Sequence, residues 1–330
     1  MRMSRLCALW LEEIEAGERV RPQTIDRYRG IVGFSVEPAL GSLRVREVTV
    51  SVADRFLKDH AVTRPSQAQS IKQVLGQIMG MAVRHDAIPS NPVRNVARLR
   101  SRRKEIRALD EEQPSAARAA VRQWRTGPDE HGHMPVGPKP SGDLADIIDI
   151  FLATGRRIGD VLAIRWSDVD LAATRPTPAV TGTLVQLKGR GIVRQDATKS
   201  DAGRRTVFLP HFAVEVLLRR QVSCPPNPNN AAFATRNGTW VSSHNVRRQW
   251  RTVREGTGLE WVTLHAFRKT VATVIDRDAE SKGAAAQMGH SSEAITEGYH
   301  VVKTNLAPVF SSILDKLGPK GAGGPGVSLG

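Results

Sequence analysis

Several absences narrow the chemistry open to this chain of 330 residues. Its two cysteines, Cys7 and Cys224, lie far apart and form no C-x-x-C pair, so we predict neither a disulfide framework nor a cysteine-based zinc site. Such thiols are typical of a reduced, cytosolic protein. No lipidation motif, long apolar run or signal-peptide pattern occurs, so we expect no membrane association. A P-loop, a dinucleotide-binding fingerprint and internal repeats are also missing.

Tyrosine is equally scarce, with only Tyr28 and Tyr299 in the chain. Tyr28 lies on the apolar face of a predicted N-terminal helix, so we expect it to pack in a core. Tyr299 stands among polar residues, away from any apolar stripe, and is not placed for packing. Alone it would be an ordinary surface tyrosine. Its spacing from the motifs described below makes it a candidate nucleophile instead.

Positive charge is abundant, with a formal net charge of +15 and a pI of about 10.6. Arginine supplies much of this excess, and its planar guanidinium suits bidentate contact with phosphate. A net positive charge of this size favours a polyanionic partner such as nucleic acid. Charge alone leaves open a basic surface with no nucleic-acid role.

Helical spacing of apolar residues predicts a mostly helical region over residues 4–97. The run 98–107 is dense in charge and poor in apolar residues, which marks a domain boundary. We expect it to be a solvated linker in free solution that can also lie along a DNA backbone. The predicted organisation is a helical domain over 1–97, a basic linker over 98–109, a second domain over 110–317 and a disordered tail over 318–330.

The second domain is predicted to mix helices with a few strands. Helical patterns occupy about 113–124 and 143–166 and resume near 211, 243, 266, 281 and 292, whereas residues 126–142 are rich in Gly and Pro and read as a loop. Apolar residues alternate with a period of two in three short runs, which predicts three antiparallel strands at 183–187, 192–194 and 205–209. The expected fold class is therefore mainly α with a small antiparallel β-sheet.

Six candidate site residues lie in separate short motifs of the second domain. They are Arg157, Lys199, His265, Arg268, His290 and Tyr299. Together they provide what a tyrosine needs to attack a phosphodiester without a metal or other cofactor. Two arginines can stabilise the charge that grows on the non-bridging oxygens of the transition state.

Proton transfer assigns the remaining roles. A tyrosine hydroxyl with a pKa of about 10 needs a base, and the leaving oxygen needs an acid. His265 is the candidate base and Lys199 the candidate acid, while His290 is a secondary donor to the phosphate or orients the nucleophile. His265 and Arg268 are spaced i, i+3 on a predicted helix and should point the same way.

These motifs, in this order, resemble the tyrosine recombinase (phage integrase) family. The matching segments are residues 154–170, Lys199 with the following 204–210, 263–270, 287–292 and Tyr299. The resemblance covers about 145–305 with high specificity, and 5–97 resemble the family's helical, SAM-like core-binding domain more loosely. Asp160 stands where the family more often has glutamate, which leaves a contact with Arg157 possible. The core-binding pattern begins almost at Met1, so no separate arm-binding domain is expected.

The resemblance implies a site-specific recombinase that integrates or excises a mobile element through a covalent 3′-phosphotyrosyl intermediate. Neither ATP nor a metal is implied. The implied partners are double-stranded DNA attachment sites and three further copies of the chain in a tetramer on DNA, with a directionality factor as a further candidate. The implied location is cytoplasmic, on the nucleoid of a bacterial or phage-infected cell.

Three questions stay open at this stage: the activity, the biological reaction and the role of a C-terminal apolar stripe. A topoisomerase-like nickase would use similar chemistry, and a non-catalytic DNA-binding protein could share the scaffold. Integration, excision and dimer resolution are not distinguished. An apolar stripe near the C-terminus either docks on a neighbouring copy or packs on its own domain; it consists of Leu306, Val309, Phe310, Ile313, Leu314 and Leu317.

Overall fold

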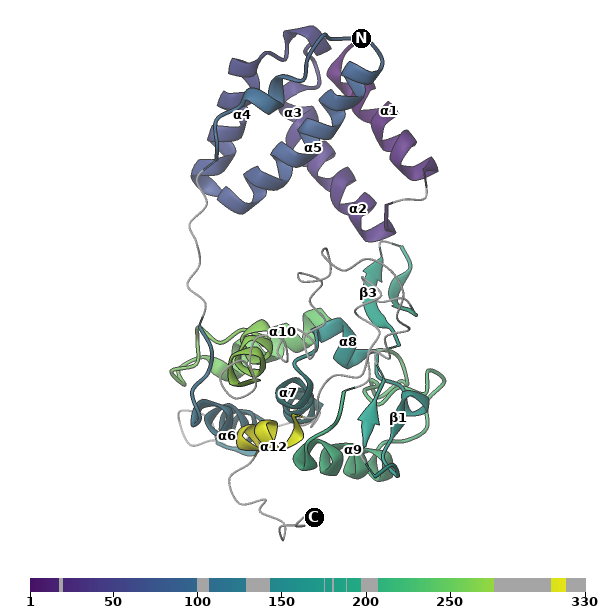
Figure 1. The fold of residues 1–330 in the computed structure, drawn as a ribbon, viewed down its shortest axis with the longest axis vertical. Helices are drawn as coiled ribbons and strands as arrows, with labels where there is room; N and C mark the ends of the chain where they lie inside the picture. The colour runs from purple at the N-terminus through teal and green to yellow at the C-terminus, as the bar shows by residue number, and fades with distance from the viewer. Residues whose placement is uncertain are drawn as a thin grey trace, which may run out of the picture. The chain divides into compact units, whose positions relative to one another are not determined.

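The chain folds into two compact units in a computed structural model, one of Met1–Glu105 with Gln186–Gly191 and one of Ile106–Val185 with Ile192–Gly330 (Figure 1). The residues that the structure describes are 1–17, 20–99, 107–128, 143–174, 176–179, 181–187, 189–196, 207–275 and 310–318.

The first unit is all helical over its described N-terminal residues. Its helices are α1 (Met3–Ala16), α2 (Pro22–Ile31), a π-helical turn (Val32–Val36), α3 (Glu37–Leu40), α4 (Val50–Thr63) and α5 (Pro65–Arg84), with 3-10 turns at Val45–Glu47 and Pro92–Asn95. Pro22 begins α2, and Thr49 caps α4 by accepting from the Val52 amide at 3.4 Å. Tyr28 is buried, with its ring 5.4 Å from that of Trp10, which confirms its predicted place in a core.

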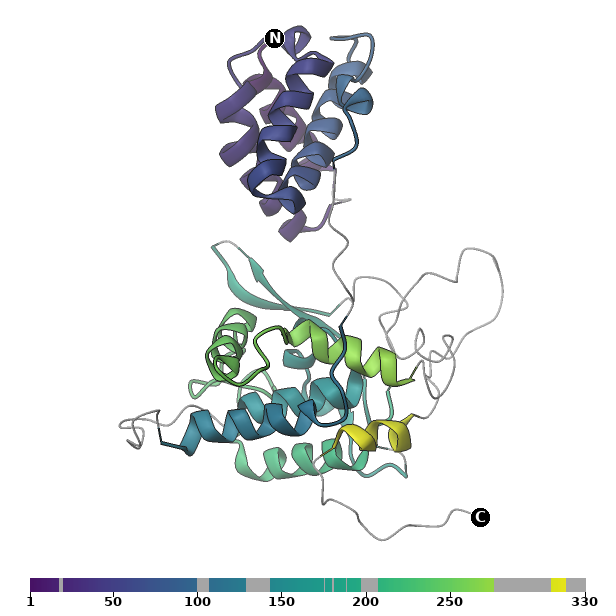
Figure 2. The same ribbon diagram turned by 90° about the vertical axis from the view of Figure 1, so that its left-hand side faces the viewer.

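The second unit surrounds one buried helix. Its elements are α6 (Gln113–Thr126), α7 (Asp143–Thr154), α8 (Ile158–Leu162), a 3-10 turn (Trp166–Asp168), β1 (Val169–Asp170), β2 (Thr177–Pro178), β3 (Thr183–Leu187), β4 (Gly191–Gln195), α9 (His211–Ser223), α10 (Ser243–Arg254), a helix at 264–275, α12 (Ser311–Leu314) and a 3-10 turn (Asp315–Leu317). Ten of the twelve residues of α7 are buried. This helix contacts α6, α8, α9, α10 and α12, which explains why it is apolar on nearly every side (Figures 1 and 2).

The mainly helical fold with a small antiparallel sheet component is confirmed, but the strands differ from the prediction. β1 and β2 pair antiparallel in the register Val169↔Pro178 and Asp170↔Thr177, and β3 and β4 form a second two-stranded sheet. The third predicted strand is wrong over 207–209, where the backbone is irregular, while 205–206 lie outside the described residues. Leu209 donates its amide to the carbonyl of Pro176, the residue before β2, at 2.9 Å.

The helix predicted over 143–166 is also wrong in its continuity, because the chain breaks after Thr154 and restarts at Ile158. Gly155 has a φ of +60° and donates its amide to the Phe151 carbonyl at 2.8 Å. A glycine in the left-handed region is a common helix terminator, since it has no Cβ to clash there. The apolar pattern continues through the break because both helices pack on the same core.

The described part of the C-terminal stripe packs on its own unit. Phe310, Leu314 and Leu317 are buried in the core of the second unit, and α12 contacts α7. Arg118 of α6 donates through Nη2 to the Leu317 carbonyl at 2.6 Å and through Nε to the Asp149 carboxylate at 2.6 Å. Leu306, Val309 and the tail 319–330 lie outside the described residues. No helix in the described ranges is long and apolar enough to cross a membrane.

Candidate active site

The break between α7 and α8 exposes the first candidate arginine. Arg157 is the N-cap of α8, with an extended backbone (φ −75°, ψ 155°), and its side chain is exposed. Its carbonyl accepts from the amides of Asp160 and Val161 at 2.9 and 3.0 Å, which fixes the start of the short helix. The preceding Arg156 is fully buried and donates through Nη2 to the Pro178 carbonyl, tying the turn to β2. The two neighbouring arginines therefore face different surroundings.

His265 and Arg268 lie on the helix at 264–275 and line the same pocket, which confirms the predicted i, i+3 arrangement. Arg268 is only 3% exposed, and its Nη1 donates to the Gly155 carbonyl at 2.5 Å. That bond joins the helix of the H-x-x-R motif to the turn that presents Arg157. Two motifs more than 100 residues apart thus depend on one glycine carbonyl.

The turn before this helix is held by α10. The Val262 carbonyl accepts from Nε1 of Trp250 at 2.7 Å and also from Nη1 of Arg254. The Trp250 ring is buried, with its centroid 5.4 Å from that of Phe267 on the following helix. Two donors on one carbonyl, with an aromatic contact beside them, fix where the His265 helix begins.

These elements enclose a pocket of about 490 Å³. Its lining consists of Phe151, Arg156, Arg157, Ile158, Arg247, Trp250, Arg251, Arg254, Thr263, Leu264, His265 and Arg268. Half of these residues are arginines. The pocket is therefore suited to an anionic ligand and unfavourable for a cation.

Sequence reasoning named two of the six arginines as site residues and missed the buried Arg156 and the three that lie on α10, namely Arg247, Arg251 and Arg254. Their spacing of i, i+4 and i+7 places them on one face of the helix, opposite the buried Val246 and Val253. The signal was present in the sequence, because α10 carries four arginines and no acidic residue over Ser243–Arg254. In the described part of the chain, no carboxylate forms an ion pair with any of the three.

The cationic surroundings act on His265. Partial burial of the imidazole lowers the pKa of His265, and the positive charges of Arg268, Lys269 and Arg157 lower it further. The ring is therefore neutral at neutral pH and able to accept a proton, as a general base must be.

The contact with Arg157 that the sequence left possible is not formed by the Asp160 carboxylate. Asp160 is 8% exposed, and over the described ranges its side chain makes no hydrogen bond or ion pair with Arg157. Its backbone amide donates to the Arg157 carbonyl instead. The residue therefore helps to start α8, and its carboxylate does not orient the guanidinium.

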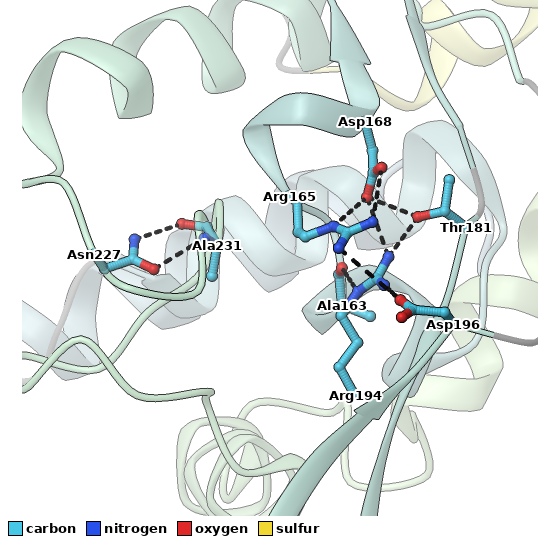
Figure 3. A network of polar contacts seen from close by, with 8 residues as sticks. All are labelled: Ala163, Arg165, Asp168, Thr181, Arg194, Asp196, Asn227 and Ala231. Carbon is cyan, nitrogen blue, oxygen red and sulfur yellow. Dashed lines mark hydrogen bonds and ion pairs between the residues drawn. The ribbon is translucent and has the colours of Figure 1, made fainter.

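The residues that follow Arg157 in the motif build a polar network (Figure 3). Arg194 of β4 donates through Nε to the Ala163 carbonyl at 3.0 Å and through Nη2 to Asp168 at 3.1 Å. Asp168 also accepts from Arg165 at 3.2 Å and from the Thr181 hydroxyl at 2.7 Å. Burial opposes ionisation of Asp168, but the hydrogen bonds from Arg165 and Thr181 and the nearby positive charges outweigh it and lower the pKa of Asp168. The network ties β4 to the end of α8 and so to the turn that presents Arg157.

Three candidate residues, Lys199, His290 and Tyr299, lie outside the described residues. The structure therefore brings together Arg157, His265 and Arg268 of the six. Among the residues that can be examined, no group of three His, Cys, Asp or Glu side chains is arranged to hold a metal ion.

Comparison with known proteins gives a consistent result. Residues 140–305 match the Phage integrase family. The chain is similar to an integrase of Streptomyces ambofaciens, 24% identical over 325 positions that cover 92% of this chain and 76% of that protein. It is also similar to the tyrosine recombinase XerC of Xanthomonas campestris pv. campestris (strain B100), 23% identical over 313 positions that cover 92% and 86%.

Solved structures share the fold. A Tn1549 transposon integrase in complex with a circular intermediate DNA has a TM-score of 0.71 at 18% identity, over 92% of this chain and 97% of that chain. A lambda integrase tetramer bound to a Holliday junction has a TM-score of 0.64 at 16% identity, over 91% and 80%.

Proposed function

The chain belongs to the phage integrase family, and on that premise we propose that it is a site-specific DNA recombinase of the integrase type. It cuts and rejoins DNA through a covalent 3′-phosphotyrosyl intermediate and thereby integrates or excises a mobile element. One observation carries this proposal beyond family membership. Arg157, His265 and Arg268, from two motifs far apart in sequence, line one arginine-rich pocket.

The proposed chemistry begins with the phosphate. Arg157 and Arg268 donate to the non-bridging oxygens, whose charge grows in the transition state, and each such donor contributes about 100- to 1,000-fold in rate. His265 accepts the proton of the attacking tyrosine, in keeping with its lowered pKa. Lys199 delivers a proton to the 5′-oxygen, and His290 assists at the phosphate or orients the nucleophile.

Tyr299 is the proposed nucleophile. Its oxygen forms a bond to phosphorus while the bond from phosphorus to the 5′-oxygen breaks, and the free 5′-hydroxyl can later reverse the step on a partner strand. The bond energy is kept in the phosphotyrosine, so ligation needs no ATP. Burial of Tyr28 in the core of the first unit supports this choice, because a tyrosine packed in a core is not available to attack DNA.

The wider arrangement is proposed from the same chemistry. The helical region 1–97 acts as a core-type DNA-binding domain, 98–109 as a basic linker, and 110–317 as the catalytic domain. Four protomers act on two double-stranded DNA sites and exchange strands through a Holliday junction, with a directionality factor as a candidate regulator. The recombination reaction takes place in the cytoplasm, on the nucleoid.

Trapping the covalent intermediate tests the proposal. The protein is incubated with a nicked duplex that carries a repeat flanking its gene, so that the 5′-hydroxyl fragment diffuses away and religation is prevented. We expect a protein–DNA band on a denaturing gel with the parent protein and with Tyr28→Phe, and none with Tyr299→Phe. Mobility shifts should show that Tyr299→Phe still binds the duplex.

The outcomes separate the remaining possibilities. A covalent band that survives Tyr299→Phe would show that another residue is the nucleophile. Binding without any covalent band would favour a non-catalytic DNA-binding protein. Covalent nicking without strand exchange between two sites would favour a topoisomerase-like activity.

A further inference from the structure

The segment Arg107–Leu109 begins at the last residue of the basic run 98–107, and it is attached at two places to the part of the chain that carries His265 and Arg268. Arg107 is exposed, yet its guanidinium carbon lies 4.2 Å from the centroid of the Trp261 ring. This is a cation–π contact, with the charge over the ring face. Trp261 is four residues before His265, on the turn that leads into the helix at 264–275.

The second attachment is to the helix at 264–275 itself. The amide of the buried Leu109 donates to Oγ1 of Thr270 at 2.9 Å, and that hydroxyl donates to the Ala266 carbonyl at 3.0 Å. Thr270 lies two residues beyond Arg268 and is itself fully buried. The segment therefore contacts the chain at Trp261, before the H-x-x-R motif, and at Thr270, after it.

The Trp261 side chain is half-buried and packs against the core of the second unit. Its neighbour Val262 is fully buried, and the Val262 carbonyl holds two donors from α10, Trp250 and Arg254. A guanidinium that stacks on this ring is thus held relative to the turn that sets the start of the His265 helix.

We propose that Arg107 and Trp261 are positioning residues for DNA cleavage, whose stack holds the end of the basic run 98–107 against the helix of His265 and Arg268. This inference rests on the recombinase function proposed above. Phosphate contacts made by the run then favour the arrangement of the pocket in which both residues face the cleaved phosphate. Neither side chain touches the reacting atoms.

If Arg107 instead contacted a DNA phosphate directly, its replacement would have a different effect on affinity and rate. An arginine that simply adds one more phosphate contact gains nothing from a tryptophan beneath it, and its loss would weaken DNA binding. A positioning residue instead changes the rate at saturating DNA, because its effect is on the geometry of the bound complex. Rate and affinity therefore distinguish the two.

The first measurement is the rate of covalent-complex formation at saturating nicked duplex, with affinity measured separately by mobility shift. We expect Arg107→Gln to lower the saturating rate about two- to five-fold, the range that a partly exposed cation–π contact supplies. Affinity should stay within about two-fold, and Arg107→Lys should restore most of the rate. Arg122→Gln, an exposed arginine of α6, is the matched control for the loss of one charge.

A double-mutant cycle ties the effect to the ring. In a Trp261→Leu background, Arg107→Gln should cause no further loss, because the stack is already absent. An equal loss in both backgrounds, or a fall in affinity with an unchanged rate, would overturn the proposal in favour of direct DNA contact by Arg107. An unchanged rate and affinity would overturn it as well.

A measurement without DNA keeps this inference separate from the proposed function. Hydrogen exchange of the free protein should show faster exchange over 264–275 in Arg107→Gln than in Arg122→Gln. Exchange that matches the control would contradict the positioning role, whether or not the parent protein cleaves DNA. Absence of a covalent band for the parent protein would instead count against the recombinase function.

Discussion

At the scale of single residues, Arg268 has two tasks that would ordinarily compete. Its guanidinium is almost completely buried and donates to the Gly155 carbonyl, yet the residue lines the pocket in which an anion is expected. A guanidinium has five N–H donors, so the same side chain can bind a carbonyl and a phosphate. The buried bond also reduces the freedom of the side chain, and a pre-positioned donor stabilises a transition state more effectively than a mobile one.

The electrostatics of His265 lead to a prediction about pH. Because the pKa of His265 is lowered, the imidazole stays neutral at neutral pH and gains a proton only in more acidic solution. A general base must be neutral, so kcat/KM for cleavage should rise with pH through this pKa and be level near pH 7. Lys269→Gln removes one of the positive charges that lower the pKa of His265, so the acidic limb should move to higher pH while the rate at the plateau hardly changes.

The control for this prediction is Lys58→Gln in the first unit, which removes the same charge far from His265 in sequence. It should leave the acidic limb in place. An acidic limb that is also unmoved by Lys269→Gln would show that another group titrates in the reaction.

At the scale of elements, α8 and β3 approach each other unusually closely at Gly159. A Cβ built at this glycine would lie 2.6 Å from Oγ1 of Thr183 and 2.9 Å from the Leu184 carbonyl. Only a residue without a side chain allows this approach, so the glycine is required for packing and not for backbone freedom. The position of α8 matters because Arg157 is its N-cap.

Gly159→Ala should therefore push α8 away from β3. We expect the free energy of unfolding to fall by about 1–3 kcal/mol, as is usual when a methyl group is forced into a filled site. Cleavage should also slow, because Arg157 moves with α8. Denaturant unfolding followed by tryptophan fluorescence measures the first effect, and covalent-complex formation measures the second.

A matched substitution is available at Gly30 of α2, where a Cβ would meet nothing within 4 Å. Gly30→Ala should be neutral or stabilise by up to about 1 kcal/mol, since alanine is the better helix former. If Gly159→Ala unfolds at the same denaturant concentration as the parent protein, then the two elements can separate without loss, and the close approach has no energetic role.

At the scale of the whole molecule, the formal charge of +15 indicates an anionic partner, and the pocket indicates where that partner binds. Arginines of the α7–α8 turn, of α10 and of the helix at 264–275 converge there. Phosphate contacts by such residues release counterions from DNA, and the affinity then falls linearly on a log–log plot against salt. A flat salt response would contradict the charge argument.

The α10 arginines allow a sharper form of this test. Arg251 lines the pocket, whereas its near neighbour Arg248 on the same helix is exposed but does not. Arg251→Gln should reduce the slope of log Kd against log salt by about one, the contribution of one phosphate contact. Arg248→Gln removes the same charge and should change the slope less. Equal changes in the two slopes would mean that the pocket arginine contacts phosphate no more than an arginine outside the pocket does.

The sequence by itself determined the class of this protein, and it named three residues that line one pocket in the structure, Arg157, His265 and Arg268. The charge, the order of the motifs and the i, i+3 spacing of His265 and Arg268 needed only local patterns, and local patterns are what helical periodicity and short motifs record. The catalytic assignments of all six candidate residues stay predictions, and three of them, Lys199, His290 and Tyr299, lie outside the described residues. The mostly helical fold followed from the same periodicity.

Tertiary structure decided what depends on contacts between distant residues. The break at Gly155 was hidden because α7 and α8 bury their apolar residues in one core, so the pattern runs on across the turn. The third predicted strand is not formed over 207–209, where the Leu209 amide bonds to the Pro176 carbonyl. The α10 arginines line the pocket because α10 packs on α6, α7 and α8 and binds the Val262 carbonyl through Trp250 and Arg254, and no pattern within α10 specifies these partners. Sequence patterns report which face of an element is buried, whereas only the folded chain decides what covers it.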